Sequence, residues 1–155
     1  MSKLPLLLAL FCIVFCSACS TSMDCLTPPQ MLSIRFVDKD GNDLLRPANP
    51  NAFKISEIRL YDLRDGKKTY SDVKLDSLPD AGYYFLKTEL SWKAHKGAEF
   101  FLQLSNTVTD KIYLRYDEVS NNGCASYKFV EFRYNDKVYE PTEVPPYFKE
   151  FKIVK

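Results

Sequence analysis

Residues 111–137, KIYLRYDEVSNNGCASYKFVEFRYNDK, carry the clearest strand pattern in the chain. Apolar and polar side chains alternate over residues 112–116, as they do in a strand with one buried face. An aromatic-rich run follows at 127–134, and Asn122-Gly123 between the two segments is a turn signal. Asn135-Asp136 ends the second segment in the same way. The stretch therefore predicts strands joined by tight turns.

Similar short segments occur on both sides of this stretch. The further strand candidates are residues 32–36, 58–61, 67–75, 82–87, 99–104, 138–139 and 148–154, with Asp65-Gly66 as a hairpin turn. No segment keeps a period of 3.6 residues over three turns; residues 89–97 come nearest and predict a turn or a short helical bridge. Many short strands separated by turn residues are typical of a sandwich or barrel. We therefore expect an all-β fold, a single antiparallel β-sandwich of about seven to nine strands.

Two longer matches refine this expectation. Residues 34–44 (IRFVDKDGNDL), 58–67 (IRLYDLRDGK) and 80–85 (DAGYYF) resemble the transthyretin-like or carboxypeptidase-regulatory-like pattern of strands and Asp-Gly turns. An immunoglobulin-like (Ig-like) sandwich would show a similar sequence, so both topologies stay open. Residues 111–137 are similar to small lipoproteins of unknown function from Bacteroidota-type bacteria. These resemblances imply a secreted β-sandwich and assign no catalytic residues.

The N-terminus carries an export signal. Residues 4–18, LPLLLALFCIVFCSA, form an apolar run behind Lys3. A membrane-spanning helix needs roughly 20 apolar residues, so this shorter run indicates a cleaved secretory signal peptide. It ends in Cys16-Ser17-Ala18-Cys19, which resembles the lipobox of bacterial lipoproteins, although Cys16 stands where Leu is usual. The resemblance implies cleavage before Cys19 and lipidation of its sulfur, whereas an ordinary cleavage nearby would leave Cys19 free.

This interpretation divides the chain into three parts. Residues 1–18 are the lipoprotein signal peptide, residues 19–30 the acylated N-terminus and tether, and residues 31–155 the β-sandwich domain. Acyl chains such as palmitate on Cys19 would give durable membrane attachment. Ser20 follows Cys19 where Asp would favour the inner membrane, so we expect a lipid-anchored protein of the bacterial cell envelope. The expected location is the outer membrane, on its periplasmic or surface face.

Two cysteines remain after these assignments. Of the five in the chain, Cys12 and Cys16 leave with the signal peptide and Cys19 is acylated. Cys25 and Cys124 are predicted to form a disulfide, because an exported chain reaches an oxidising compartment. Buried free thiols are the alternative. A Cys/His metal site that includes His95 lacks the short paired spacing that such sites show.

Composition excludes several classes of function. The chain has 21 basic and 20 acidic residues and a net charge of +1, too little positive field for a nucleic-acid binder. It has five glycines and one histidine, with no phosphate-binding loop and no nucleophile-elbow motif. His95, beside two lysines, is interpreted as an exposed loop residue. We expect no cofactor and no enzymatic activity.

Two groups of residues are weak candidates for binding sites. The oxygen-rich set Asp38, Asp40, Asn42 and Asp43 surrounds Gly41 and would suit Ca²⁺, but its spacing fails the EF-hand pattern. A β-turn between strands explains the same residues.

Aromatic residues form the second group. Trp92 is a candidate sugar-stacking platform or a packing residue, and Tyr113 and Tyr134 are candidates for an exposed binding face. Tyr61, Tyr70 and Tyr139 are expected on the same outer face.

Three functions stay open. The favoured one is a lipid-anchored, non-enzymatic envelope module that binds a partner or has a structural role. The second is a glycan- or ligand-binding accessory lipoprotein, and the third a carboxylate-dependent hydrolase. The expected partners are the membrane, through the N-terminal lipid, and an envelope protein or glycan.

Overall fold

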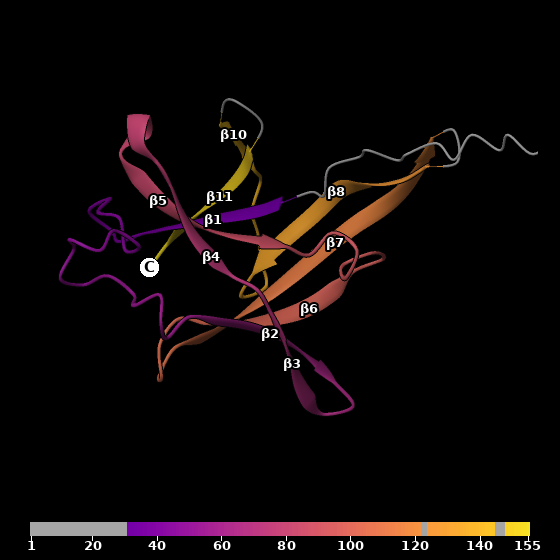
Figure 1. Cartoon of the computed structure of the whole chain (residues 1–155), viewed down its shortest axis with the longest axis horizontal. Coiled ribbons are helices and arrows are strands. Elements are labelled where there is room, and N and C mark those ends of the chain that lie inside the picture. Colours follow the sequence, from indigo (N-terminus) through magenta and orange to yellow (C-terminus); the bar gives the residue numbers. More distant parts are fainter. Residues whose placement is uncertain (1–30, 122–123, 145–147) are drawn as a thin grey trace, which may run out of the picture.

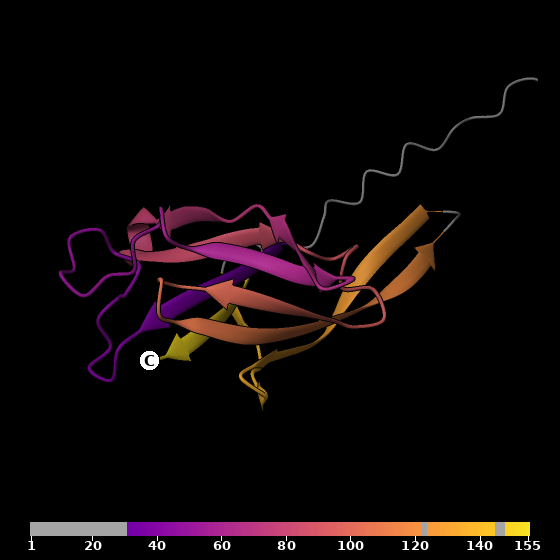
Figure 2. The same cartoon turned by 90° about the horizontal axis from the view of Figure 1, so that it is seen from below.

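Residues 31–121, 124–144 and 148–155 are described by a computed structural model, and they form two β-sheets packed face to face (Figure 1). In Figure 2, seen from below, strands of the two sheets overlap in the view. The only helical element among the described residues is a 3₁₀ turn at Pro79–Ala81. No described segment forms a helix of the length and hydrophobicity that a membrane span requires.

The first sheet has five strands in the order β10-β11-β1-β5-β4. Their bounds are β1 Met31–Val37, β4 Lys74–Leu78, β5 Tyr83–Glu89, β10 Thr142–Val144 and β11 Phe148–Val154. All neighbours are antiparallel except β1 and β11, which run parallel with Ser33 opposite Glu150. The strand that opens the described domain therefore lies beside the strand that closes it.

The second sheet has six strands in the order β3-β2-β6-β7-β8-β9. Their bounds are β2 Arg59–Arg64, β3 Lys67–Ser71, β6 Ala98–Gln103, β7 Thr109–Asn121, β8 Cys124–Tyr134 and β9 Lys137–Val138. β7 pairs with β6 only as far as Leu114, but its ladder with β8 continues to Asn121. The β7–β8 hairpin therefore reaches beyond the body of the sandwich (Figures 1 and 2).

The expected all-β sandwich is confirmed, and the structure corrects its details. Eleven strands occur in the described residues, more than the seven to nine expected, and one pair is parallel. The single strand expected over residues 67–75 is two strands in different sheets: β3 pairs with β2, whereas β4 pairs with β5. The chain crosses between the layers at Asp72-Val73. Of the two alternatives expected for residues 89–97, the turn is the one observed, and it follows the end of β5 at Glu89.

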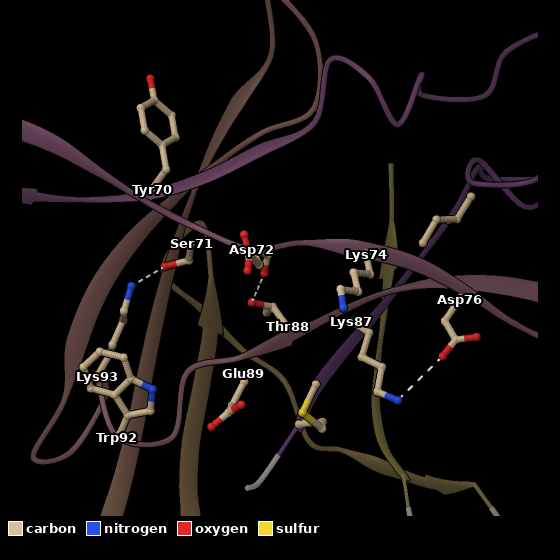
Figure 3. A pocket seen from close by; sticks show the side chains of 12 residues that line it. Tyr70, Ser71, Asp72, Lys74, Asp76, Lys87, Thr88, Glu89, Trp92 and Lys93 are labelled. Carbon is tan, nitrogen blue, oxygen red and sulfur yellow. Dashed lines mark hydrogen bonds and ion pairs between the residues drawn. The ribbon is translucent and has the colours of Figure 1, made fainter.

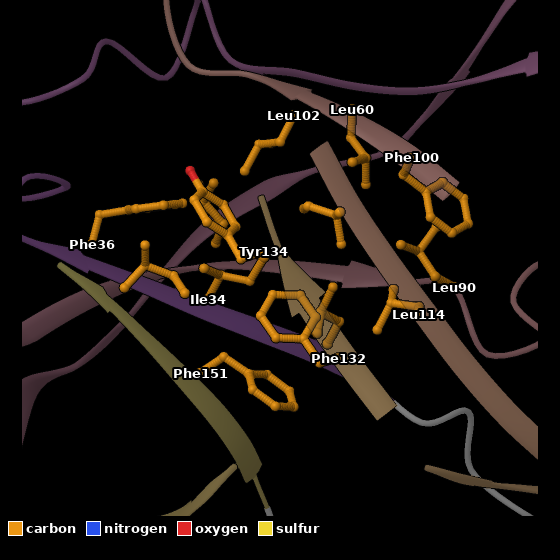
Figure 4. Close-up of a cluster of buried hydrophobic side chains, with 14 of the residues drawn as sticks. Ile34, Phe36, Leu60, Leu90, Phe100, Leu102, Leu114, Phe132, Tyr134 and Phe151 are labelled. Carbon is orange, nitrogen blue, oxygen red and sulfur yellow. The ribbon is translucent and has the colours of Figure 1, made fainter. Parts of the chain in front are cut away.

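Strand alternation fills the space between the sheets with aromatic and aliphatic side chains (Figure 4). Phe36, Phe100 and Phe132 are fully buried. Phe132 of β8 meets Phe151 of β11 across the layers, with ring centroids 4.2 Å apart. Replacing a buried Phe by Ala typically costs about 3–5 kcal/mol, so these contacts hold the two sheets together.

Candidate functional site

A groove of about 590 Å³ opens where the chain crosses from β3 to β4 (Figure 3). It is bounded by the crossover, by the end of β5 and by the turn that follows β5. Trp92 and Tyr70 lie on its rim and are 55% and 58% exposed. These are the most exposed aromatic side chains of the described residues, so the groove combines two open rings with a polar interior.

The turn after β5 fixes the position of Trp92. Leu90 and Ala94 are fully buried on either side of it, and the Ala94 N–H donates to the Leu90 carbonyl at 2.9 Å. Because these two residues hold the turn against the core, Trp92 between them projects to solvent. The aromatic ring is therefore displayed by a rigid turn.

Two hydrogen bonds hold the opposite wall. The Thr88 hydroxyl donates to the Asp72 carbonyl at 2.7 Å, which fixes the crossover to β5. The Lys93 ammonium donates to the Ser71 hydroxyl at 2.7 Å and so links the Trp92 turn to the end of β3. In Figure 3, the Lys93–Ser71 hydrogen bond is seen between the side chains of Trp92 and Tyr70. The crossover, β5 and the Trp92 turn are thus joined to one another by side-chain hydrogen bonds.

Charges in the groove are balanced. Asp72, Asp76 and Glu89 face Lys74, Lys87 and Lys93, and Lys87 lies 3.6 Å from the Asp76 carboxylate. Neither a strongly cationic nor a strongly anionic ligand is favoured by such a lining. Aromatic faces combined with hydroxyl, carboxylate and ammonium groups fit a neutral polyhydroxylated ligand, whose C–H faces stack and whose hydroxyls form hydrogen bonds.

Trp92 therefore lies where the sugar-platform interpretation needs it, but the two tyrosine candidates do not join it. Tyr134 is buried, because it has the same strand parity as Phe132 and so faces the core; its expected place on an outer face is wrong. Its hydroxyl donates to Asp110 at 2.5 Å. Tyr113 is on the outer face but half-buried, with the Arg133 guanidinium 3.9 Å from its ring centroid.

The other outer-face tyrosines differ among themselves. Tyr61 is buried beneath its neighbours and stacks on Phe101 at 5.4 Å, and Tyr139 is half-buried against Phe132. Only Tyr70 is exposed as expected. The tyrosines expected on one outer face therefore do not form a continuous exposed surface. The exposed aromatic pair is Trp92 and Tyr70, on the rim of the groove.

The oxygen-rich segment forms a turn in which the Asp38 and Asp43 carboxylates accept hydrogen bonds. Asp38 accepts the N–H groups of Asp40 and Asn42 at 2.9 and 2.8 Å and the Asn42 side-chain amide at 2.8 Å. The Asn42 amide in particular lowers the pKa of Asp38. Asp43 accepts the N–H groups of Leu45 and Tyr84. These hydrogen bonds are those of a turn between strands, as the second interpretation expects. In the described part of the chain, no group of three or more His, Cys, Asp or Glu is arranged to hold a metal.

His95 is half-buried, which corrects its expected place in an exposed loop. Its Nε2 lies 3.7 Å from Glu118, and its ring meets Tyr127 edge-on at 6.0 Å. An isolated bridge joins its backbone to Tyr116. His95 thus docks the Trp92 turn onto the β7–β8 hairpin and takes no part in the groove.

The cysteine predictions lie mostly outside the described residues. Cys19, Cys25 and the whole segment 1–30 fall there. Cys124 begins β8, opposite Asn121. The disulfide therefore stays a prediction.

Sequence reasoning missed the partnership of Tyr70 with Trp92. The crossover that brings them together lies at Asp72-Val73, without the Gly or Pro that usually marks a strand end. Ser71-Asp72 was the only available signal, and it is weak.

The chain matches no known protein-family model, no curated protein and no solved structure. Its function is therefore argued from the groove and from the sequence alone.

Proposed function

We propose that the protein is a non-enzymatic, lipid-anchored module of the bacterial cell envelope that binds a carbohydrate in the Trp92–Tyr70 groove. The observation that carries the carbohydrate assignment is the pair of exposed rings on the rim of a charge-balanced polar groove. The sequence alone favoured a protein partner or a structural role. Because of this groove, we prefer a glycan as the ligand. The lipid anchor rests on the lipobox-like residues 16–19.

Ring stacking supplies affinity in this proposal, and the polar wall supplies orientation. A sugar ring placed against Trp92 would bring its hydroxyls toward Ser71, Lys93 and Glu89. Each aromatic contact contributes about 0.5–1.5 kcal/mol beyond burial, which suits weak binding repeated along a polymer.

Trp92 is the single tryptophan of the chain, so its fluorescence reports directly on the groove. We expect a saturable change in emission when the full chain, in nonionic detergent, is titrated with a panel of neutral oligosaccharides. Trp92→Ala and Tyr70→Ala should each weaken binding about five- to tenfold in calorimetry.

Leu63→Ala is the matched control. Leu63 is 51% exposed on β2, away from the groove, and its replacement should leave the affinity unchanged. The carbohydrate assignment fails if no oligosaccharide of the panel changes the emission, or if Leu63→Ala weakens binding as much as Trp92→Ala. Cleavage of a bound oligosaccharide would contradict the non-enzymatic part of the proposal.

A further inference from the structure

A second cavity, of about 660 Å³, lies at the opposite end of the β4–β5 hairpin. It is enclosed by Arg35 of β1, by the loop of residues 41–51 and by Gly82 before β5. It shares no lining residue with the groove around Trp92. Whatever it binds is therefore independent of the carbohydrate proposal.

Two arginines, Arg35 and Arg46, are among the residues that line this cavity. In the described part of the chain neither one forms an ion pair with a carboxylate. Arg46 donates to the Gly82 carbonyl, which holds it beside the cavity. The Arg35 guanidinium packs 4.1 Å from the centroid of the Tyr83 ring, and its Nε is buried without a hydrogen-bond partner.

Two carboxylates lie near these arginines. Asp43, the only acidic residue that lines the cavity, accepts backbone N–H groups from Leu45 and Tyr84 at 2.8 and 2.7 Å. Burial and then the neighbouring Glu150 carboxylate, on the same sheet face as Arg35, raise the pKa of Tyr83 to about 12, so Glu150 lies close to the ring against which Arg35 packs. The charged residues that line the cavity are thus two arginines and one aspartate, with a formal net charge of +1.

Guanidinium groups present planar pairs of N–H donors that match the oxygen atoms of a phosphate. Asn51, in the same loop, adds an exposed side chain to the lining. A bare phosphate ion would fill only a small part of 660 Å³, so the volume suits an ester with a polar group attached.

We propose that this cavity binds the phosphate group of a small polyol or sugar ester, with Arg35 and Arg46 as its two cationic ligands. Glycerol 3-phosphate is the probe, titrated calorimetrically into the full chain in nonionic detergent at low ionic strength. It should bind more tightly than inorganic phosphate, glycerol should not bind, and added salt should weaken binding because charge drives it.

Arg46→Gln, in an exposed loop, tests the site with little risk to the fold, and Arg35→Gln tests the strand residue, with circular dichroism as the check on folding. Each should weaken glycerol 3-phosphate binding about tenfold or more, since hydrogen bonds to charged groups are strong. Arg64→Gln, which removes an exposed arginine from the other sheet, is the matched control and should have no effect.

The proposal is overturned if glycerol 3-phosphate does not bind, or binds equally well to Arg46→Gln and to the unmodified chain. Equal affinity for inorganic phosphate would overturn the ester assignment. Loss of binding in Trp92→Ala would place the ligand in the groove instead, whereas unchanged binding there would leave the two sites independent.

Discussion

Asp110 is a buried carboxylate that accepts three side-chain hydrogen bonds. It is buried at the start of β7 and accepts hydrogen bonds from Tyr134, from the Asn135 amide at 2.7 Å and from Lys155, which also forms its ion pair. Burial raises the pKa of Asp110, but the hydrogen bonds from Lys155, Tyr134 and Asn135 outweigh it and leave the pKa below its ordinary value. The ionised form is thus the one that the fold stabilises.

Asp110→Asn should lower the free energy of unfolding by about 1–3 kcal/mol at neutral pH, because it removes the charge from these hydrogen bonds. A carboxylate with a lowered pKa in the folded state stabilises the fold above its unfolded pKa of about 3.8 and loses that contribution as the pH falls below it. The variant should therefore lose less stability than the unmodified chain between pH 7 and about pH 3, as measured by urea unfolding.

Asp136→Asn supplies the comparison. Asp136 is exposed and lies 3.7 Å from Lys111, so its replacement should change stability by less than about 0.5 kcal/mol. If both variants behave alike, the hydrogen bonds of Asp110 do not stabilise the fold.

Among the elements, the turn that carries Trp92 depends on Gly97. Its φ is +100°, and a Cβ built there would overlap the Tyr113 hydroxyl and lie 3.0 Å from the Tyr113 Cζ. Glycine is needed at this position for both reasons, because a side chain would strain the backbone and displace the ring that packs against it.

Gly97→Ala should therefore destabilise the fold by about 2–4 kcal/mol, through backbone strain and overpacking together. Gly41→Ala is the matched control: its φ is also positive, at +85°, but nothing lies within 4 Å of its Cβ. It should cost only about 1 kcal/mol. Equal losses for the two variants in thermal unfolding would show that Tyr113 does not restrict this turn.

The elements also show where sequence patterns were sufficient. β1 and β7 were predicted from the alternation of apolar and polar side chains, and β5 from a continuous apolar-aromatic run, because these patterns reflect side chains that face one shared core. The change of sheet at Asp72-Val73 was not predictable, since it is decided by which distant strand each half pairs with. The position of Tyr70 in the candidate site depends on that crossover. Trp92 could therefore be identified as a candidate from the sequence, but Tyr70 could not be placed beside it.

At the scale of the whole molecule, the proposed lipid anchor would attach the domain that carries the groove to a membrane. Cys19→Ala should release the protein from membranes, because it removes the thiol that would carry the lipid. The measurement is fractionation of cells after a high-salt wash, with Cys25→Ala as the control that should stay in the membrane fraction. A Cys19→Ala protein that still sediments with membranes would contradict lipid anchoring through this residue.

The parallel pairing of β1 with β11 has a consequence for the order of folding. Residue 33 lies opposite residue 150, so this contact joins the two ends of the domain. Contacts between residues so far apart in the chain form slowly, because a long loop must close before they are made. Until β11 is available, β1 has only β5 beside it and the five-stranded sheet stays incomplete. If the chain is exported as proposed, it would cross the membrane before its native sheet can close, and folding would finish only after its last strand has emerged on the far side.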